Sequence, residues 1–69
     1  MDTIELTRMA TDLVRSRETS WPQLELVHSS REPDGSYYFI IARHPVQLGS
    51  HRVVVLSSQG ELIEYRHGK

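Results

Sequence analysis

A chain of 69 residues, with no cysteine and with eight Lys and Arg against nine Asp and Glu, is expected to form one small domain. The near balance of charge gives no electrostatic reason to expect nucleic acid or an anionic membrane as a partner, and the absence of cysteine excludes disulfides. A domain of this size buries only about 60% of its unfolded surface, so its stability is marginal, and oligomerisation is a common remedy.

The first expected element is an amphipathic helix from Asp2 to about Arg17. Asp2 followed by Glu5 resembles a capping box in which Asp2 is the N-cap. Trp21 precedes Pro22, which restricts Trp21 to extended conformations and ends the helix before it. Apolar residues recur at the spacing of one helix face, at Leu6, Met9, Ala10, Leu13 and Val14.

Four strands are expected to follow as an antiparallel meander. The segment from Glu32 to Ser36 predicts a hairpin with a left-handed Gly35, and Ser58-Gln59-Gly60 predicts a tight turn with Gly60 at the bulge position. The predicted fold class is therefore α+β, one N-terminal helix packed on a four-stranded antiparallel β-meander (α-β-β-β-β) in a single domain spanning 1–69. The predicted strands cover Gln23 to Ser29, a segment ending near His44, His51 to Ser57, and Glu61 to His67.

The turns also predict a register. If Glu32 faces Ser36, then His28 lies opposite Ile40, Leu26 opposite Ala42 and Val27 opposite Ile41. One predicted face is assigned to the core beneath the helix and contains Leu24, Leu26, Tyr38, Ile40, Ala42, Val53, Val55, Ile63 and Tyr65. The other contains Val27, Phe39, Ile41, Val54, Leu56 and Leu62, with a charged rim of Glu25, Arg43, Arg52, Glu64 and Arg66.

Both faces of this sheet are apolar, although a strand wetted on one side should alternate apolar with polar residues. One helix covers one face, so the second face is expected to contact a protein surface. The leading hypothesis is a small non-enzymatic binding module, acting as stand-alone inhibitors, immunity proteins or phage accessory proteins do. The alternative is a face-to-face homodimer with a regulatory or structural role, whose function lies on the helix or in the loop 45–50. The predicted contact residues are Val27, Phe39, Ile41, Arg43, Arg52, Val54, Leu56 and Leu62.

The histidines are the only candidate metal ligands with a suggestive arrangement. The predicted register places His44, His51 and possibly His67 at one end of the same sheet face, where three imidazoles could bind zinc. The alternative is that they are solvated histidines at the sheet end. The uncertain register and the lack of a carboxylate beside the histidines favour this second interpretation, so no metal and no cofactor are predicted.

Catalysis and nucleic-acid binding receive less support from the residues. The serines fall at strand ends or turns without a Gly-x-Ser-x-Gly elbow, and the glycines form no phosphate-binding loop. An enzyme is therefore not expected. Tyr37 and Phe39 with Arg43 and Arg52 loosely suggest base stacking, but a basic funnel is missing. The Trp21 side chain could either insert into a partner protein at an interface or cover one end of the core.

The N-terminal sequence Met1 to Glu5 lacks the basic start and apolar core of a signal peptide, and no run approaches membrane-spanning length. A cytoplasmic protein of bacterial or phage origin is expected. The order of helix and strands and the stretch from Val53 to Ile63, VVVLSSQGELI, are similar to the close of PepSY-type domains. This resemblance covers one hairpin of a kind that is generic to β-meanders, and it implies no function.

Overall fold

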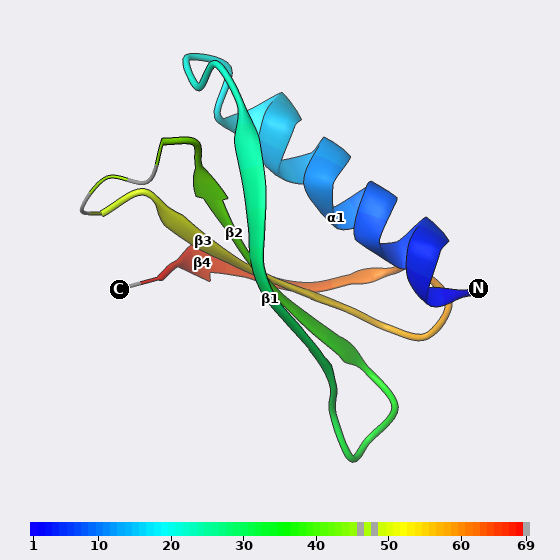
Figure 1. Ribbon diagram of the computed structural model, residues 1–69. Coiled ribbons are helices and arrows are strands. Elements are labelled where there is room, and N and C mark those ends of the chain that lie inside the picture. The colour runs from blue at the N-terminus through cyan, green and yellow to red at the C-terminus, as the bar shows by residue number, and fades with distance from the viewer. Residues whose placement is uncertain (46, 48, 69) are drawn as a thin grey trace.

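The computed structural model describes residues 1–45, 47 and 49–68, so Val46 and Leu48 of the predicted connector lie outside the described residues. One helix precedes four strands, and these elements are α1 (Thr3–Arg17), β1 (Leu24–Arg31), β2 (Tyr37–Arg43), β3 (His51–Leu56) and β4 (Leu62–His67). The strands form one antiparallel sheet in the order β1-β2-β3-β4, and α1 lies across one of its faces (Figure 1). The predicted α-β-β-β-β arrangement is confirmed. In the described part of the chain, no helix is long and apolar enough to cross a membrane.

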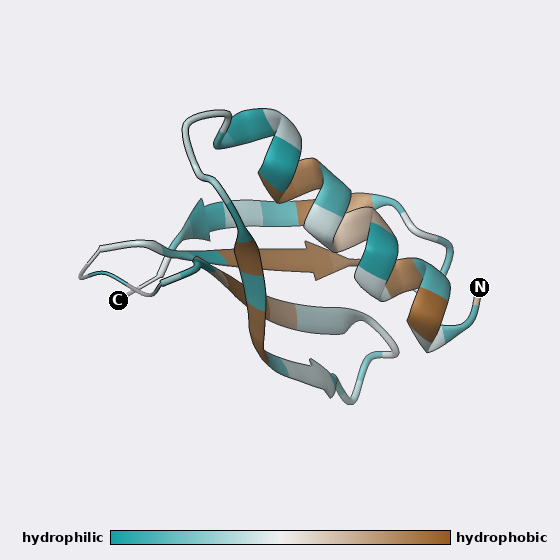
Figure 2. Ribbon diagram, turned by 45° about the horizontal axis from the view of Figure 1, so that its top comes forward, coloured by the Kyte–Doolittle hydropathy of each residue, from teal (hydrophilic) through white to brown (hydrophobic). Residues whose placement is uncertain are grey.

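Helix α1 begins and ends close to the predicted residues. The backbone N–H of Glu5 donates to the Asp2 carboxylate at 2.8 Å, which confirms Asp2 as the N-cap. At the other end, the N–H of Glu18 donates to the carbonyl of Val14 at 2.7 Å. Figure 2 shows the hydrophobic centre of the sheet beneath this helix. The fully buried helix residues are Leu6, Ala10 and Val14.

Both predicted turns are present. The N–H of Glu32 donates to the carbonyl of Ser36 at 2.8 Å, and Gly35 has a φ of +91°. In the second turn Gly60 has a φ of +86°, the left-handed conformation that a bulged three-residue loop requires. A side chain at position 60 would be strained by this φ and would also collide with Met1. The turn chemistry of the sequence therefore fixed the two hairpins correctly.

A β-bulge interrupts each outer strand, and neither bulge was predicted. In β1, His28 pairs with Ile40 as expected, but the register shifts at Val27, so that Leu26 pairs with Ile41 instead of Ala42. In β4, a second shift leaves Ile63 without a partner. A one-residue shift moves every later side chain to the opposite face of the sheet. The predicted pairings of Leu26 and Val27 are therefore wrong.

The helix covers the face that was predicted to be free. Because of the bulges, Tyr65 pairs with Val54, and Leu24 lies on the same face. The largest fully buried side chains of the sheet, Phe39, Ile41 and Val54, lie on the face that α1 covers. The assignment of the two faces was thus inverted. The core consists of Leu6, Ala10, Val14, Phe39, Ile41, Val54 and Leu56, packed against Leu13, Trp21, Leu24, Tyr37 and Tyr65.

Candidate protein-contact face

The sheet face that points away from α1 is called the open face here. Strand pairing arranges its residues in cross-strand rows, with β2 and β3 in the centre and β1 and β4 at the margins. The first row is Glu25, Ala42 and His51; the second is His28, Ile40, Val53 and Arg66; the third is Ser30, Tyr38, Val55 and Glu64. The centre of the open face is therefore apolar and its margins are polar.

A groove of about 460 Å³ runs over the middle of the open face. Val53 is only 2% exposed, whereas Val27, on the bulge of β1, is 46% exposed. The ring of His28 meets the ring of Tyr38 edge to face, with 6.4 Å between the centroids. The groove is lined by Val27, Tyr38, Ile40, His51, Val53, Arg66 and Gly68. An apolar hollow with a nearly buried floor suits a protruding aliphatic side chain of another protein.

The margins of the open face carry exposed polar pairs. Nδ1 of His44 lies 3.1 Å from the Glu25 carboxylate, and Arg66 pairs with Glu64 on β4. Both outer strands are also bulged, which twists an edge and hinders the addition of another strand. The open face, and not a sheet edge, is therefore the surface best suited to contact.

Most of the predicted contact residues lie elsewhere. Phe39, Ile41 and Val54 are fully buried under α1 and Leu56 is 3% exposed, so the prediction that they form the free face is wrong. The reason is the inverted assignment of the two faces described above.

The other four predicted contact residues differ in their positions. Val27 does line the groove of the open face. Leu62 is exposed beside α1, where it lines a hollow of about 370 Å³ with Met9. Arg43 pairs with Leu24 across the sheet and is half-buried. Arg52 is only 7% exposed and belongs to an ion pair in the interior, so the prediction that it lies on a solvated rim is wrong.

Arg52 ties the C-terminal end of α1 to the sheet through Glu18. Its Nε and Nη2 donate to the two carboxylate oxygens of Glu18 at 3.1 and 3.3 Å. Its Nη1 donates to the carbonyls of Gly49 and His51 at 3.0 and 2.9 Å. A forked guanidinium that meets both oxygens of a carboxylate is the strongest common form of ion pair. Because Arg52 is satisfied within the fold, it is a structural residue and not a free contact.

Two aromatic residues complete this ion pair. The hydroxyl of Tyr65 donates to Glu18 at 3.1 Å, and the Arg52 guanidinium lies 4.8 Å from the centroid of the Trp21 ring. Trp21 packs against the core, as expected of a lid. No local sequence signal joins Glu18 to Arg52, because 34 positions separate them. Only the fold brings the two residues together.

Stability is expected to fall in acid because of Glu18. The hydrogen bonds from Arg52 hold the pKa of the Glu18 carboxyl below its ordinary 4.5, against the opposing effect of burial. The stabilisation is therefore complete above pH 4.5 and is lost as the pH falls through the lower folded pKa. Urea unfolding between pH 6 and about pH 3 should show this loss, and Glu18→Gln should flatten the profile. An equally steep profile for Glu18→Gln would contradict this role and leave Asp34, whose pKa is also lowered by hydrogen bonds from Ser36, as the cause.

The predicted group of three histidines does not assemble. His51 pairs with Ala42 on the open face, whereas His67 pairs with Arg52 on the helix face, because the bulge at Ile63 reverses the end of β4. His44 lies against Glu25. Within residues 1–45, 47 and 49–68, no three His, Cys, Asp or Glu side chains are close enough to hold one metal ion. The expectation that the histidines share one face is wrong.

The melting temperature should not respond to zinc or to EDTA, because imidazoles on opposite faces of a sheet cannot share an ion. Differential scanning fluorimetry with each addition measures this directly. A rise of several degrees with zinc, reversed by EDTA, would show that the two faces are incorrectly assigned at this end of the sheet.

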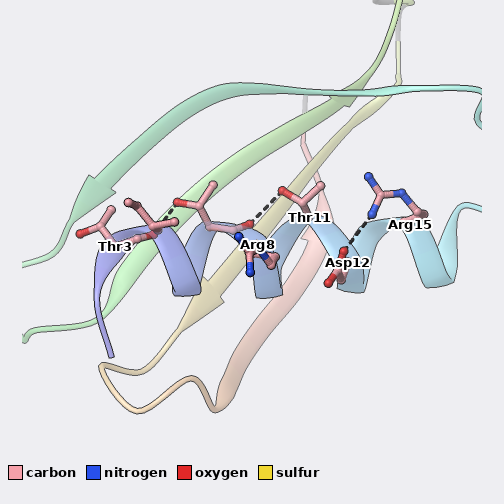
Figure 3. Close-up of a pocket in the computed structure, with 7 residues that line it drawn as sticks. Thr3, Arg8, Thr11, Asp12 and Arg15 are labelled. Carbon is pink, nitrogen blue, oxygen red and sulfur yellow. Dashed lines mark hydrogen bonds and ion pairs between the residues drawn. The ribbon is translucent and has the colours of Figure 1, made fainter.

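The outer side of α1 offers a further hollow, of about 580 Å³, but helix residues alone form it (Figure 3). Four of its polar side chains bond within the helix. The Thr7 and Thr11 hydroxyls donate to carbonyls one turn earlier at 2.7 and 2.8 Å, and Arg15 pairs with Asp12 at 2.8 Å. A single helix therefore forms this hollow, whereas residues of all four strands line the groove of the open face.

Sequence reasoning correctly grouped central-strand residues of the open face, namely Tyr38, Ile40, Ala42, Val53 and Val55, but assigned that face to the core. No signal in the central strands marked the covered face, since Tyr37 lies on the covered face and Tyr38 on the open one. No protein-family model, curated protein or solved structure matches this chain. The geometry of the open face therefore carries the functional argument.

Proposed function

We propose that this protein is a small non-enzymatic binding module that lays the open face of its sheet against another protein surface. One observation supports this most. An apolar surface is left uncovered by the described elements, and it consists of Val27, Tyr38, Ile40 and Val55. Helix α1 packs against the opposite face of the sheet. An apolar centre with a charged margin is typical of protein interfaces.

Covering the open face would also stabilise the domain. Each 100 Å² of apolar surface removed from water contributes about 2.5 kcal/mol before the cost of association is subtracted, against the few kcal/mol that hold a domain of this size together. Binding would thus stabilise the fold as well as perform the function. This linkage makes a rise in melting temperature a useful signature of any true partner.

The setting we propose is the cytoplasm of a bacterium or an infected bacterial cell. The absence of cysteine fits a reducing compartment. The net charge of −1 gives no electrostatic reason to expect nucleic acid as the partner. Small inhibitors, immunity proteins and phage accessory proteins work by occupying a partner surface, and the comparison with them is one of mode of action only.

The proposal is tested by two matched substitutions. Ile40→Glu places a carboxylate in the centre of the open face, whereas Ile4→Glu places one on the outer side of α1, where Ile4 is 72% exposed. Both purified variants should remain folded. Tagged wild type and Ile4→Glu should bind the same protein from an extract of the host, and the purified pair should re-form, whereas Ile40→Glu should bind at least about a hundredfold more weakly. Equal binding by folded Ile40→Glu would contradict the proposal.

A further inference from the structure

We infer that the occupant of the open face is a second copy of this chain, related by a two-fold axis that runs parallel to the strands between β2 and β3. The inference rests on the proposed function and names its partner. Three observations carry it, namely the size of the face, the match of large and small side chains across the axis, and the distribution of charge on the two margins.

The size of the face is adequate for a dimer. The molecule measures 31 × 20 × 16 Å and has an accessible surface of 4466 Å². One broad face of such a body is roughly a fifth of the surface, or about 900 Å², and a standard interface buries about 800 Å² on each partner. Bulges at both edges of the sheet leave the face as the surface through which two copies can pair.

The side chains in the centre of the face are complementary to themselves. Aligned sheets pack with their strands within about 30° of each other, so a two-fold axis along the strands lays β2 of each copy over β3 of the other. Ile40 then meets Val53 of the second copy, at the nearly buried floor of the groove. In the neighbouring row Tyr38 meets Val55. Each large side chain thus meets a smaller one, and every contact occurs twice.

The other two-fold axis, perpendicular to the strands, gives a poorer match. It lays each strand over the same strand of the second copy. Placed at the second row, it makes Val53 face Val53 and leaves the groove unfilled, and placed between the second and third rows it makes Ile40 face Tyr38 and Val53 face Val55. At these two positions large side chains meet large ones and small ones meet small ones, so the sizes favour the axis parallel to the strands.

The charges on the two margins support the same axis. With the axis along the strands, the β1 margin of one copy lies over the β4 margin of the other. Arg66 on the β4 margin then lies over His28 of the same row, and Glu25 on the β1 margin is one row away, about 7 Å along the strand and within reach of an arginine side chain. The intrachain partners, His44 and Glu64, are exposed, so exchanging them for the intermolecular pair costs little.

Sedimentation of the wild type from about 5 µM to about 500 µM tests the inference. The mass should approach twice the 8.0 kDa of one chain, and Ile4→Glu should behave in the same way. Ile40→Glu should remain a folded monomer over the whole range, its folding checked by circular dichroism. A wild type that stays monomeric at all concentrations, or a folded Ile40→Glu that dimerises like the wild type, would overturn the inference.

A charge exchange tests the axis itself. Glu25→Arg and Arg66→Glu should each raise the dissociation constant about three- to tenfold, because each places like charges together at both ends of the interface. The double variant should recover most of the wild-type affinity. Additive losses in the double variant would contradict the proposed pairing of Glu25 with Arg66.

Nuclear magnetic resonance on a mixture of isotope-labelled and unlabelled protein tests the axis independently. Intermolecular nuclear Overhauser contacts should join the methyl groups of Ile40 in one copy and Val53 in the other. Contacts between the Val53 side chains of the two copies would instead indicate the axis perpendicular to the strands and contradict the proposed one.

The outcomes also separate this inference from the proposed function. A monomeric wild type whose Ile40→Glu variant loses a different protein partner would overturn the second copy as occupant and retain the open face as the contact surface. A monomeric wild type whose folded Ile40→Glu variant binds the host partner as tightly as the wild type does would contradict both.

Discussion

Val54→Glu is expected to unfold the domain. Val54 is fully buried between β3 and α1, where a carboxylate has neither water nor a basic partner. Burying an unpaired charge costs several kcal/mol, and a domain of this size has only a few kcal/mol of stability. Circular dichroism at 25 °C should show loss of the helical signal. A thermal scan should show no cooperative transition.

The neighbouring Val55→Glu is the matched control. Val55 lies on the open face opposite Glu64, so the new carboxylate is hydrated and meets only one like charge, at a cost of up to about 1 kcal/mol. This variant should retain a cooperative transition at low protein concentration, where self-association does not contribute. A folded Val54→Glu together with an unfolded Val55→Glu would mean that the helix covers the opposite face.

Arg52→Met is expected to cost about 2–4 kcal/mol, which corresponds to a fall in melting temperature of more than about 10 °C. The substitution keeps much of the side-chain volume but leaves the Glu18 carboxylate, which is 20% exposed, without its guanidinium. It also removes the donors to the carbonyls of Gly49 and His51. Urea unfolding at pH 7 measures the loss.

A double variant shows whether the unpaired carboxylate causes the loss. Glu18→Gln in the Arg52→Met background removes the uncompensated charge, so the double variant should be less destabilised than the sum of the two single variants. Strict additivity would indicate that Arg52 acts through its packing on Trp21 and its backbone hydrogen bonds instead of through Glu18.

The local features of the fold could be read from the sequence. The spacing of Leu6, Ala10 and Val14 predicted the buried side of α1, and the turns at Gly35 and Gly60 have the predicted conformation. The alternation of side chains also predicted correctly which residues of β2 and β3 share a face. These features depend on interactions between residues that are close in the sequence, or on a period of two that a strand imposes.

The features that were missed depend on longer-range packing. Nothing in the residues around Val27 or Ile63 marks a bulge, yet these two positions decide where Leu24 and Tyr65 point. Because both faces of the central strands are apolar, the alternation defines two sets of residues without showing which set the helix covers. The ion pair of Arg52 with Glu18 was missed for a related reason, since only the finished fold brings them together.

The labelling rates of single cysteines at positions 40 and 41 test the central claim most directly, because the chain has no cysteine of its own. Ile40 lies on the open face and Ile41 is fully buried under α1. In dilute protein, a thiol reagent should modify Ile40→Cys rapidly, whereas Ile41→Cys should react only through unfolding, at least about a hundredfold more slowly. At high concentration, the cysteine at position 40 should become protected as the open face is covered. If position 41 reacts as fast as position 40 or faster, α1 does not cover the face that contains Phe39 and Val54, and the proposed contact face is wrong.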